Sequence, residues 1–282
     1  MEWKILLYAR RKEPLDIPDD LSKYPMNDFE LDYWRIVNSA PFRRLQDKTQ
    51  VFPLDKSDFV RTRLTHSMET SALAKQLATM ITANIRKNKS GTPYAMTEDE
   101  ARDAANAVMC AGLLHDIGKL KIPTELLNKP GKYTDEEFAQ VRLHTQYGYE
   151  LLKPLPLDAH IKLAALSHHE RCDGTGYPNG LTTNDIDPYA RVVAIADVYD
   201  AMTTARSYRA PLCAFQVIAN FERDGLQKYD TKCVLAFLNR IAGTYQNHRI
   251  LLSDGRSANI VMLNDKQLSR PIVQLDDGSC ID

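Results

Sequence analysis

Apolar residues recur at helical spacing along most of this chain, and this pattern limits the possible folds more than any other feature. Between residues 63 and 87 the apolar positions follow one another at steps of four or three: Leu73, Leu77, Met80, Ile81 and Ile85. Such spacing predicts one face of a long amphipathic helix. Two capping boxes, Thr97-x-x-Glu100 and Thr134-x-x-Glu137, predict further helices over 98–115 and from 134 to about 152.

Helical patterns also fit the segments 157–169, 189–203, 214–224 and 231–242. The sequence therefore predicts an all-α body over residues 29–243. Residues 1–28 contain Pro14, Pro18 and Pro25 among mixed charges, and we interpret them as an irregular N-terminal arm.

The periodicity changes after residue 243. Short apolar runs at 250–252 and 260–262 flank Asp254-Gly255, and a third run at 271–273 precedes a second Asp-Gly pair at 277–278. Asp-Gly pairs between apolar runs are typical of β-hairpins. Residues 244–282 are therefore expected to form a small C-terminal β-subdomain.

Charge and composition exclude several classes of protein. The net charge is −1, so no global field would attract nucleic acid or a membrane. No apolar run approaches a membrane span, and the apolar stretch at the N-terminus is too short for a signal peptide. The five cysteines are scattered, with no Cys-x-x-Cys pair, which indicates neither a disulfide framework nor a thiolate zinc site. These features favour a cytoplasmic protein and leave its oligomeric state open.

Histidines and aspartates fall at the predicted helices in a pattern typical of metal ligands. Five of the seven histidines and two aspartates are involved: His66, His115, Asp116, His144, His168, His169 and Asp197. Helical spacing places His66 on the face of Leu73 and Leu77, toward the core. Neutral imidazoles and carboxylates suit divalent transition metals. An aspartate directly after a histidine, as in His115-Asp116, can bridge two ions that act together on one phosphate.

Each residue also has a plainer interpretation. A single histidine on an apolar helix face, such as His66 or His144, is more often a hydrogen-bonded core residue, and Asp197 alone would be an ordinary interior acid. We interpret His160, near a helix start, as structural and His248, before the β-subdomain, as exposed. The metal interpretation depends on the surrounding motifs.

Residues 105–210 resemble the HD-GYP family of cyclic di-GMP phosphodiesterases. Residues 115–119 are similar to the family's His-Asp-x-Gly-Lys motif. Residues 168–178 match every fixed position of its His-His-Glu-x-x-Asp-Gly-x-Gly-Tyr-Pro signature, and residues 197–209 resemble its closing motif. The tail from Gly243 to Val273 resembles a β-extension of some members. The resemblance implies an HD-domain helical bundle.

The same resemblance implies two divalent ions, iron or manganese, joined by Asp116. His66, His115 and Asp197 would complete one site, and His144, His168 and His169 the other. Thr62 stands where some members have a glutamate that holds a third ion. Asp116 and Lys119 would be catalytic, while Lys119, Tyr177, Arg206 and Arg209 would bind substrate. Because nine residues of unbroken helix would turn Arg206 away from Asp197, the helix must end near Thr203-Thr204; otherwise the two arginines form a solvated helix end.

Residues 33–77 resemble a different HD family, the deoxynucleotide triphosphohydrolases. The similar segments are 42–46, 48–52 and 61–67, in which His66 is the ligand candidate. Residues 119–123 depart from that family, which has a His-Pro-Pro-Phe-Gly-His segment there. Basic residues between positions 35 and 63 fit either a phosphate-binding mouth or a solvated face.

The complete Gly-Tyr-Pro signature favours a phosphodiesterase that converts cyclic di-GMP, or a related cyclic dinucleotide, to the linear dinucleotide or further to GMP. Deoxynucleoside triphosphate triphosphohydrolase activity is the alternative. A catalytically inactive nucleotide sensor or partner-binding module is a third class, which the intact ligand set opposes. The expected partners are the cyclic dinucleotide and signalling proteins at the Gly-Tyr-Pro loop, with no membrane or nucleic acid.

Overall fold

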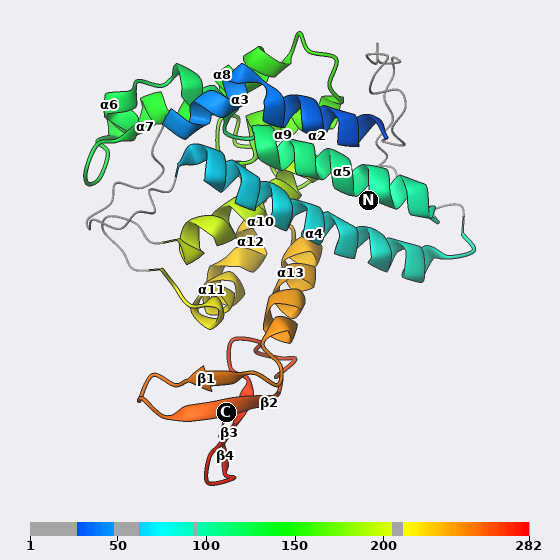
Figure 1. Cartoon of the computed structure of the whole chain (residues 1–282), viewed down its shortest axis with the longest axis vertical. Helices are drawn as coiled ribbons and strands as arrows, with labels where there is room; N and C mark the ends of the chain where they lie inside the picture. The colour runs from blue at the N-terminus through cyan, green and yellow to red at the C-terminus, as the bar shows by residue number, and fades with distance from the viewer. Residues whose placement is uncertain (1–26, 48–61, 93–94, 205–210, 282) are drawn as a thin grey trace.

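The computed structural model describes residues 27–47, 62–92, 95–204 and 211–281 of the chain. A helical bundle carries a small sheet at its C-terminal end, as Figure 1 shows. The all-α class with a C-terminal β-subdomain is therefore confirmed. The N-terminal arm lies almost wholly outside the described residues, and the domain boundaries at 28/29 and 243/244 stay predictions. None of the described helices is both long and apolar enough to cross a bilayer.

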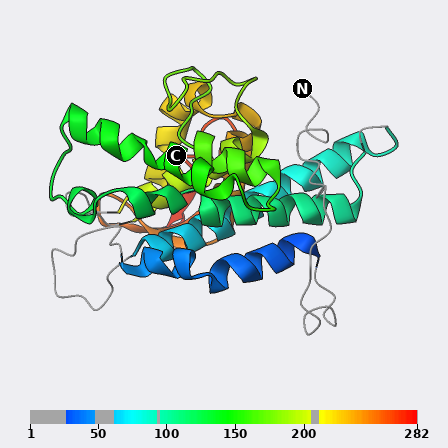
Figure 2. The ribbon, with the colours of Figure 1, turned by 90° about the horizontal axis from the view of Figure 1, so that it is seen from above.

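The longest element, α4 (Arg63–Lys89), packs along α5 (Glu98–Leu114), and Figure 2 shows the same pairing from above. The two helices approach closely because small residues lie between them. A Cβ atom added to Gly112 would lie 2.7 Å from the Ser71 Cα atom. This close approach brings the start of α4 beside the end of α5.

Further helices and turns complete the bundle around this pair. They are α2 (Asp28–Asn38), α3 (Ala40–Arg43), the 3-10 turns η1 (Arg44–Asp47) and η2 (Ile117–Lys121), α6 (Thr124–Leu127), α7 (Asp135–Arg142), α8 (His144–Leu152), α9 (Ala159–Ser167), α10 (Pro188–Thr203), α11 (Ala214–Asn220), the π-helical turn η3 (Phe221–Gly225), α12 (Leu226–Lys228) and α13 (Thr231–Thr244).

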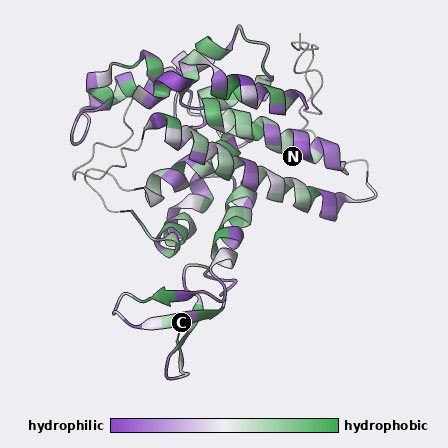
Figure 3. Cartoon of the chain, viewed as in Figure 1, coloured by the Kyte–Doolittle hydropathy of each residue, from purple (hydrophilic) through white to green (hydrophobic). Residues whose placement is uncertain are grey.

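Helix α10 forms the centre of the bundle, in contact with α4, α5, α9 and α13. All its residues from Pro188 to Asp197 are buried, and Val192, Val193 and Ile195 are fully buried. Figure 3 shows that α4 and α5 are hydrophilic where they extend away from the bundle, at the C-terminal end of α4 and the N-terminal end of α5. An aspartate on α10 is thus placed inside the core, where it needs partners.

The prediction of one helix from 134 to about 152 is wrong, because the structure divides it at Leu143. Thr134 does begin α7 with the expected capping box. The Leu143 amide then bonds to Gln140 in a tighter turn, and the His144 ring nitrogen Nδ1 bonds to the Val141 carbonyl oxygen at 2.7 Å. The His144 side chain therefore bonds to a carbonyl oxygen that would accept a backbone amide in a continuous helix, and α8 begins at His144.

Four antiparallel strands form the C-terminal sheet in the order β1-β2-β3-β4. They are β1 (Arg249–Leu251), β2 (Ser257–Met262), β3 (Ile272–Leu275) and β4 (Cys280–Ile281). Both predicted turns are present, and Gly255 and Gly278 have φ angles of 86° and 84°, which favour glycine. Ser269 donates hydrogen bonds to Glu222 of η3, which fastens the sheet to the helices.

His160 has the structural role expected of it, at the start of α9. Its ring nitrogen Nδ1 lies 2.6 Å from the Asp187 carboxylate, and the ring stacks on Tyr189. Burial alone would lower the pKa of His160, but the hydrogen bond and charge of Asp187 outweigh it and raise that pKa above 6.5.

We expect the His160–Asp187 pair to stabilise the fold in a pH-dependent way. A raised folded-state pKa gives a contribution that is complete below the unfolded value near 6.5 and is lost as pH rises through the folded value. Urea unfolding of the wild type and His160→Gln at several pH values between 5.5 and 8.5 measures it. The difference in unfolding free energy should shrink as pH rises; a constant difference would contradict the assignment.

Candidate metal centre

Six predicted ligands come together in one cluster, and the seventh, Asp197, lies at its edge. His66 is in the first turn of α4, His115 follows α5, His144 begins α8, and His168-His169 follow α9. Asp116 precedes η2, and Asp197 projects from the core helix α10. His66, His115, Asp116, His144 and His168 are almost completely buried, Asp197 is 9% exposed, and His169 is half-buried.

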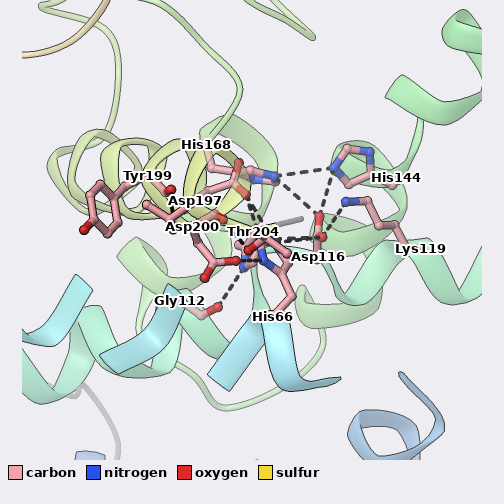
Figure 4. Close-up of polar contacts among 12 residues, drawn as sticks. His66, Gly112, Asp116, Lys119, His144, His168, Asp197, Tyr199, Asp200 and Thr204 are labelled. Atoms are coloured by element: carbon pink, nitrogen blue, oxygen red, sulfur yellow. Dashed lines mark hydrogen bonds and ion pairs between the residues drawn. The ribbon is translucent and has the colours of Figure 1, made fainter. Parts of the chain in front are cut away.

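Asp116 lies at the middle of the cluster (Figure 4), with one oxygen toward each half. Its Oδ2 atom is 3.8 Å from His66 Nε2 and 3.6 Å from His115 Nε2. Its Oδ1 atom is 3.4 Å from His144 Nε2 and 3.8 Å from His168 Nε2. The carboxylate is therefore shared by two sets of imidazoles.

The two sets can each hold an ion. Ligand atoms of Asp116, His144, His168 and His169 all lie within 4.8 Å of one another, and so do those of His66, His115 and Asp116. Asp197 borders the second set, because its Oδ1 atom is 3.2 Å from His66 Nε2 and 3.9 Å from His115 Nε2. This grouping is the one that the sequence resemblance implies.

Hydrogen bonds at the far side of each imidazole fix which nitrogen faces the centre. The Nδ1 atoms of His115, His144 and His168 lie 2.7, 2.7 and 3.1 Å from backbone carbonyl oxygens. A carbonyl oxygen only accepts, so each Nδ1 carries the proton and donates it. In the neutral ring, Nε2 then presents a lone pair to the centre, which is the arrangement that metal-binding histidines require.

Burial and charge place four of the imidazoles and Asp116 in their metal-binding protonation states. Burial lowers the pKa of His144 to about 4 and also lowers the pKa of His115, His168 and His169. Burial would raise the pKa of Asp116, but Lys119 and the imidazoles outweigh it and hold that pKa well below its usual range. Neutral imidazoles surrounding an ionised carboxylate make a donor set suited to a divalent cation.

Two buried polar atoms of the cluster lack a hydrogen-bond partner, and this shows whether metal ions would fit the site. Among the described residues, neither His115 Nε2 nor Asp116 Oδ1 has a hydrogen-bond partner. Leaving such atoms buried and unpaired is costly. A cation at each set would satisfy both atoms, so the residues present fit metal ions.

Asp200 was not predicted from the sequence, although it follows Asp197 by three residues on α10. Its Oδ2 atom lies 2.6 Å from His66 Nδ1, so the carboxylate orients the His66 ring and turns Nε2 toward Asp116. Burial would lower the pKa of His66, but hydrogen bonds with Asp197 and Asp200 outweigh it and raise that pKa. The spacing of three residues, which puts both carboxylates on one helix face, was the available signal.

Removing the Asp200 carboxylate should weaken metal binding without removing a ligand. We expect Asp200→Ala to lower metal affinity by roughly 10- to 100-fold, the usual effect of losing such a supporting carboxylate. Asp200→Asn retains an acceptor and should lose less. Titration with Mn²⁺ against a competing chelator measures the affinity, with the exposed Asp265→Ala as control. An unchanged affinity in folded Asp200→Ala would show that His66 needs no such support.

Lys119 and the Gly-Tyr-Pro loop lie against the cluster. Lys119 Nζ contacts Asp116 Oδ2, and its side chain is only 12% exposed. A Cβ atom on Gly118 would lie 1.9 Å from the His144 carbonyl oxygen, so glycine permits η2 to pack on α8. Tyr177 lies 4.7 Å from His169, measured between ring centroids. Arg206 and Arg209 lie outside the described residues, whereas α10 ends at Thr203 and Thr204 is extended, as their assignment requires.

Glu170, the third residue of the signature, closes the Gly-Tyr-Pro loop. Its buried carboxylate accepts hydrogen bonds from the backbone amides of Asn179 and Leu181 at 2.7 and 2.9 Å. The sequence motif contained this residue, but its role required the folded loop. At the other end of the site, Thr62 caps α4 by accepting a hydrogen bond from the Thr65 amide.

A helical bundle with a buried histidine–aspartate cluster at its helix ends defines a metal-binding helical domain. Residues 64–233 match the HD domain family, and the chain belongs to that family.

Curated relatives carry the names of both enzyme groups that the sequence resembles. A deoxyguanosinetriphosphate triphosphohydrolase-like protein of Listeria innocua is 49% identical over 118 residues, which cover 42% of this chain and 25% of the relative. A cyclic di-GMP phosphodiesterase of Pseudomonas aeruginosa is 39% identical over 167 residues, which cover 58% of this chain and 40% of the relative. The chain thus spans less than half the length of these relatives.

Among solved structures, an HDGYP protein from Bdellovibrio bacteriovorus is similar, with a TM-score of 0.48 and 18% sequence identity. The match covers 74% of this chain and 59% of that one.

Proposed function

We propose that this chain is a metal-dependent phosphodiesterase that hydrolyses cyclic di-GMP, or a related cyclic dinucleotide, to the linear dinucleotide and then to GMP. The observation that carries the proposal is the Asp116 carboxylate, whose two oxygens face two sets of imidazoles. Two adjacent ions suit in-line displacement at a phosphodiester. The similarity to a cyclic di-GMP phosphodiesterase supports the choice of substrate.

The proposed cofactors are two divalent ions, iron or manganese. His66, His115 and Asp197 would hold one, and His144, His168 and His169 the other, with Asp116 bridging them. Mixed imidazole and carboxylate donors without thiolates suit these metals, and the choice of iron or manganese rests on the resemblance to the HD-GYP family. When bound, such ions stabilise charge on phosphoryl oxygens and make water a better nucleophile near neutral pH.

The chain's own residues would bind and orient the substrate. Lys119 holds a positive charge beside Asp116 in a nearly closed setting, where it can meet the charge that develops on a phosphate oxygen. Hydrolysis adds water across one phosphorus–oxygen bond, and the released sugar oxygen takes a proton. Arg206 and Arg209 are expected to bind the phosphates as planar fork donors. Contact of signalling proteins with the Gly-Tyr-Pro loop stays a prediction.

Triphosphohydrolase activity is the second candidate, favoured by the 49% identity to a protein of that name. Purified protein should be incubated with Mn²⁺ or Fe²⁺ and offered cyclic di-GMP, cyclic GMP-AMP and dGTP separately. Chromatography should show linear dinucleotide and GMP from the cyclic substrate. Release of triphosphate from dGTP with intact cyclic dinucleotides would favour the second candidate, and nucleotide binding without any hydrolysis would favour the inactive sensor.

A further inference from the structure

An aromatic and cationic surface formed by α7 and the Gly-Tyr-Pro loop adjoins the metal cluster, and the sequence assigns a role to only one of its residues, Tyr177. The Arg142 guanidinium carbon lies 4.5 Å from the centre of the Phe138 ring and 5.0 Å from that of Tyr177. The Phe138 and Tyr177 rings meet edge to face at 6.2 Å. Because Tyr177 also lies against His169, these three residues continue directly from the cluster to the surface.

Both residues contributed by α7 are open to solvent. Phe138 is 38% exposed, and Arg142 is exposed as well. Within the part of the chain that the structure describes, no carboxylate pairs with Arg142, although exposed Arg102, Arg223 and Arg249 each pair with one. The rings therefore hold the guanidinium, and among the described residues its hydrogen-bond donors have no carboxylate partner.

We propose that Phe138, Arg142 and Tyr177 form a guanine-binding subsite; this inference rests on the proposed function and specifies its substrate. In a cyclic dinucleotide, each base is joined through one sugar to the phosphates. A phosphate at the cluster would thus bring a base to the adjoining rings. Phe138 provides a stacking surface, and the Arg142 fork matches the O6 and N7 acceptors of guanine. Adenine presents an amino donor in place of O6, so the same fork discriminates against it.

A simpler role for Arg142 would be to fasten the Gly-Tyr-Pro loop to α7 by its ring contacts. Lysine separates the two roles, because it keeps the charge and the cation–π contact but loses the planar fork. Arg142→Lys would keep the fastening role, but its flexible ammonium group would hold guanine O6 and N7 less well than the planar fork does. Arg142→Gln changes the donors to an amide, which suits adenine.

The experiment compares the wild type, Arg142→Lys, Arg142→Gln and the control Arg240→Ala, an exposed arginine on α13. Metal content and thermal unfolding establish that each variant is intact. Dissociation constants from calorimetry, and KM and kcat where hydrolysis occurs, are measured for cyclic di-GMP and cyclic di-AMP. Both Arg142 variants should weaken cyclic di-GMP binding by roughly ten- to a hundredfold, the usual effect of losing a bidentate arginine–guanine pair. Cyclic di-AMP binding should be unchanged or, in Arg142→Gln, tighter.

Binding and hydrolysis test the two proposals separately. A wild type that binds cyclic di-GMP through Arg142 but never cleaves it would support the subsite and contradict the phosphodiesterase function. The subsite is overturned if the wild type does not prefer cyclic di-GMP to cyclic di-AMP. Normal cyclic di-GMP binding by Arg142→Lys would also overturn it and would leave Arg142 with the fastening role.

Discussion

Replacing Asp116 with alanine is expected to remove both metal ions and nearly all phosphodiesterase activity. Asp116 is the residue shared by both sets of ligands, so its loss opens both sites at once, whereas His144→Ala removes a donor from one. Because paired ions supply several kcal/mol of transition-state stabilisation, the rate should fall by roughly a thousandfold or more. Elemental analysis of anaerobically prepared protein should find close to two ions per chain in the wild type and none in Asp116→Ala.

The same substitution leaves Lys119 buried without its carboxylate partner, so it also lowers stability. Asp116→Asn preserves the volume of the side chain and one oxygen, and it serves as the second variant. The exposed His248→Ala controls for loss of a surface histidine. The bridging role would be contradicted if folded Asp116→Asn kept two ions, or if His144→Ala lost both as completely as Asp116→Ala.

Lys119→Ala is expected to lower kcat while leaving the metal content unchanged. The ammonium group is not a ligand, but it lies beside Asp116, where a reacting phosphate would lie. A charge that meets the transition state better than the ground state acts on kcat, and the loss of one such group costs roughly 10²- to 10³-fold. Steady-state kinetics with cyclic di-GMP and metal analysis of the same samples measure both effects.

Lys119→Met provides a matched comparison that keeps the length of the side chain and removes only the charge. It should behave like alanine in kcat and more like the wild type in thermal stability. If either variant raised KM alone, Lys119 would bind substrate without acting on the reaction. If either released metal, Lys119 would be supporting the Asp116 carboxylate instead.

Local signals in the sequence specified most of the helices and both turns of the sheet. The Thr97 and Thr134 capping boxes begin helices where the sequence predicts them, because capping depends only on residues three positions apart. The division at Leu143 was missed, because it depends on the His144 ring reaching back to a backbone carbonyl. Periodicity describes faces of a helix and carries no information about such a side-chain bond.

The sequence motifs identified the candidate ligands, but they did not identify the residue that orients one of them. Asp200 lies 134 positions from His66 in the sequence, and only the packing of α10 on α4 brings the two side chains together. Arg142 carries no motif either, and its relation to Tyr177 depends on how the Gly-Tyr-Pro loop folds over α7. Contacts between distant segments leave no trace in a single sequence.

The sequence by itself determined the helical class, the β-subdomain and the types of residue available to hold metal, because these depend on spacing and on side-chain chemistry. Only the tertiary structure decided that the start of α4, the ends of α5 and α9, the start of α8 and the middle of α10 meet at one point. It also decided which oxygen of Asp116 faces which imidazoles. The physical reason is that side chains from five segments share a centre only when the helices pack at fixed positions, and the close approaches at Gly112 and Gly118 set those positions.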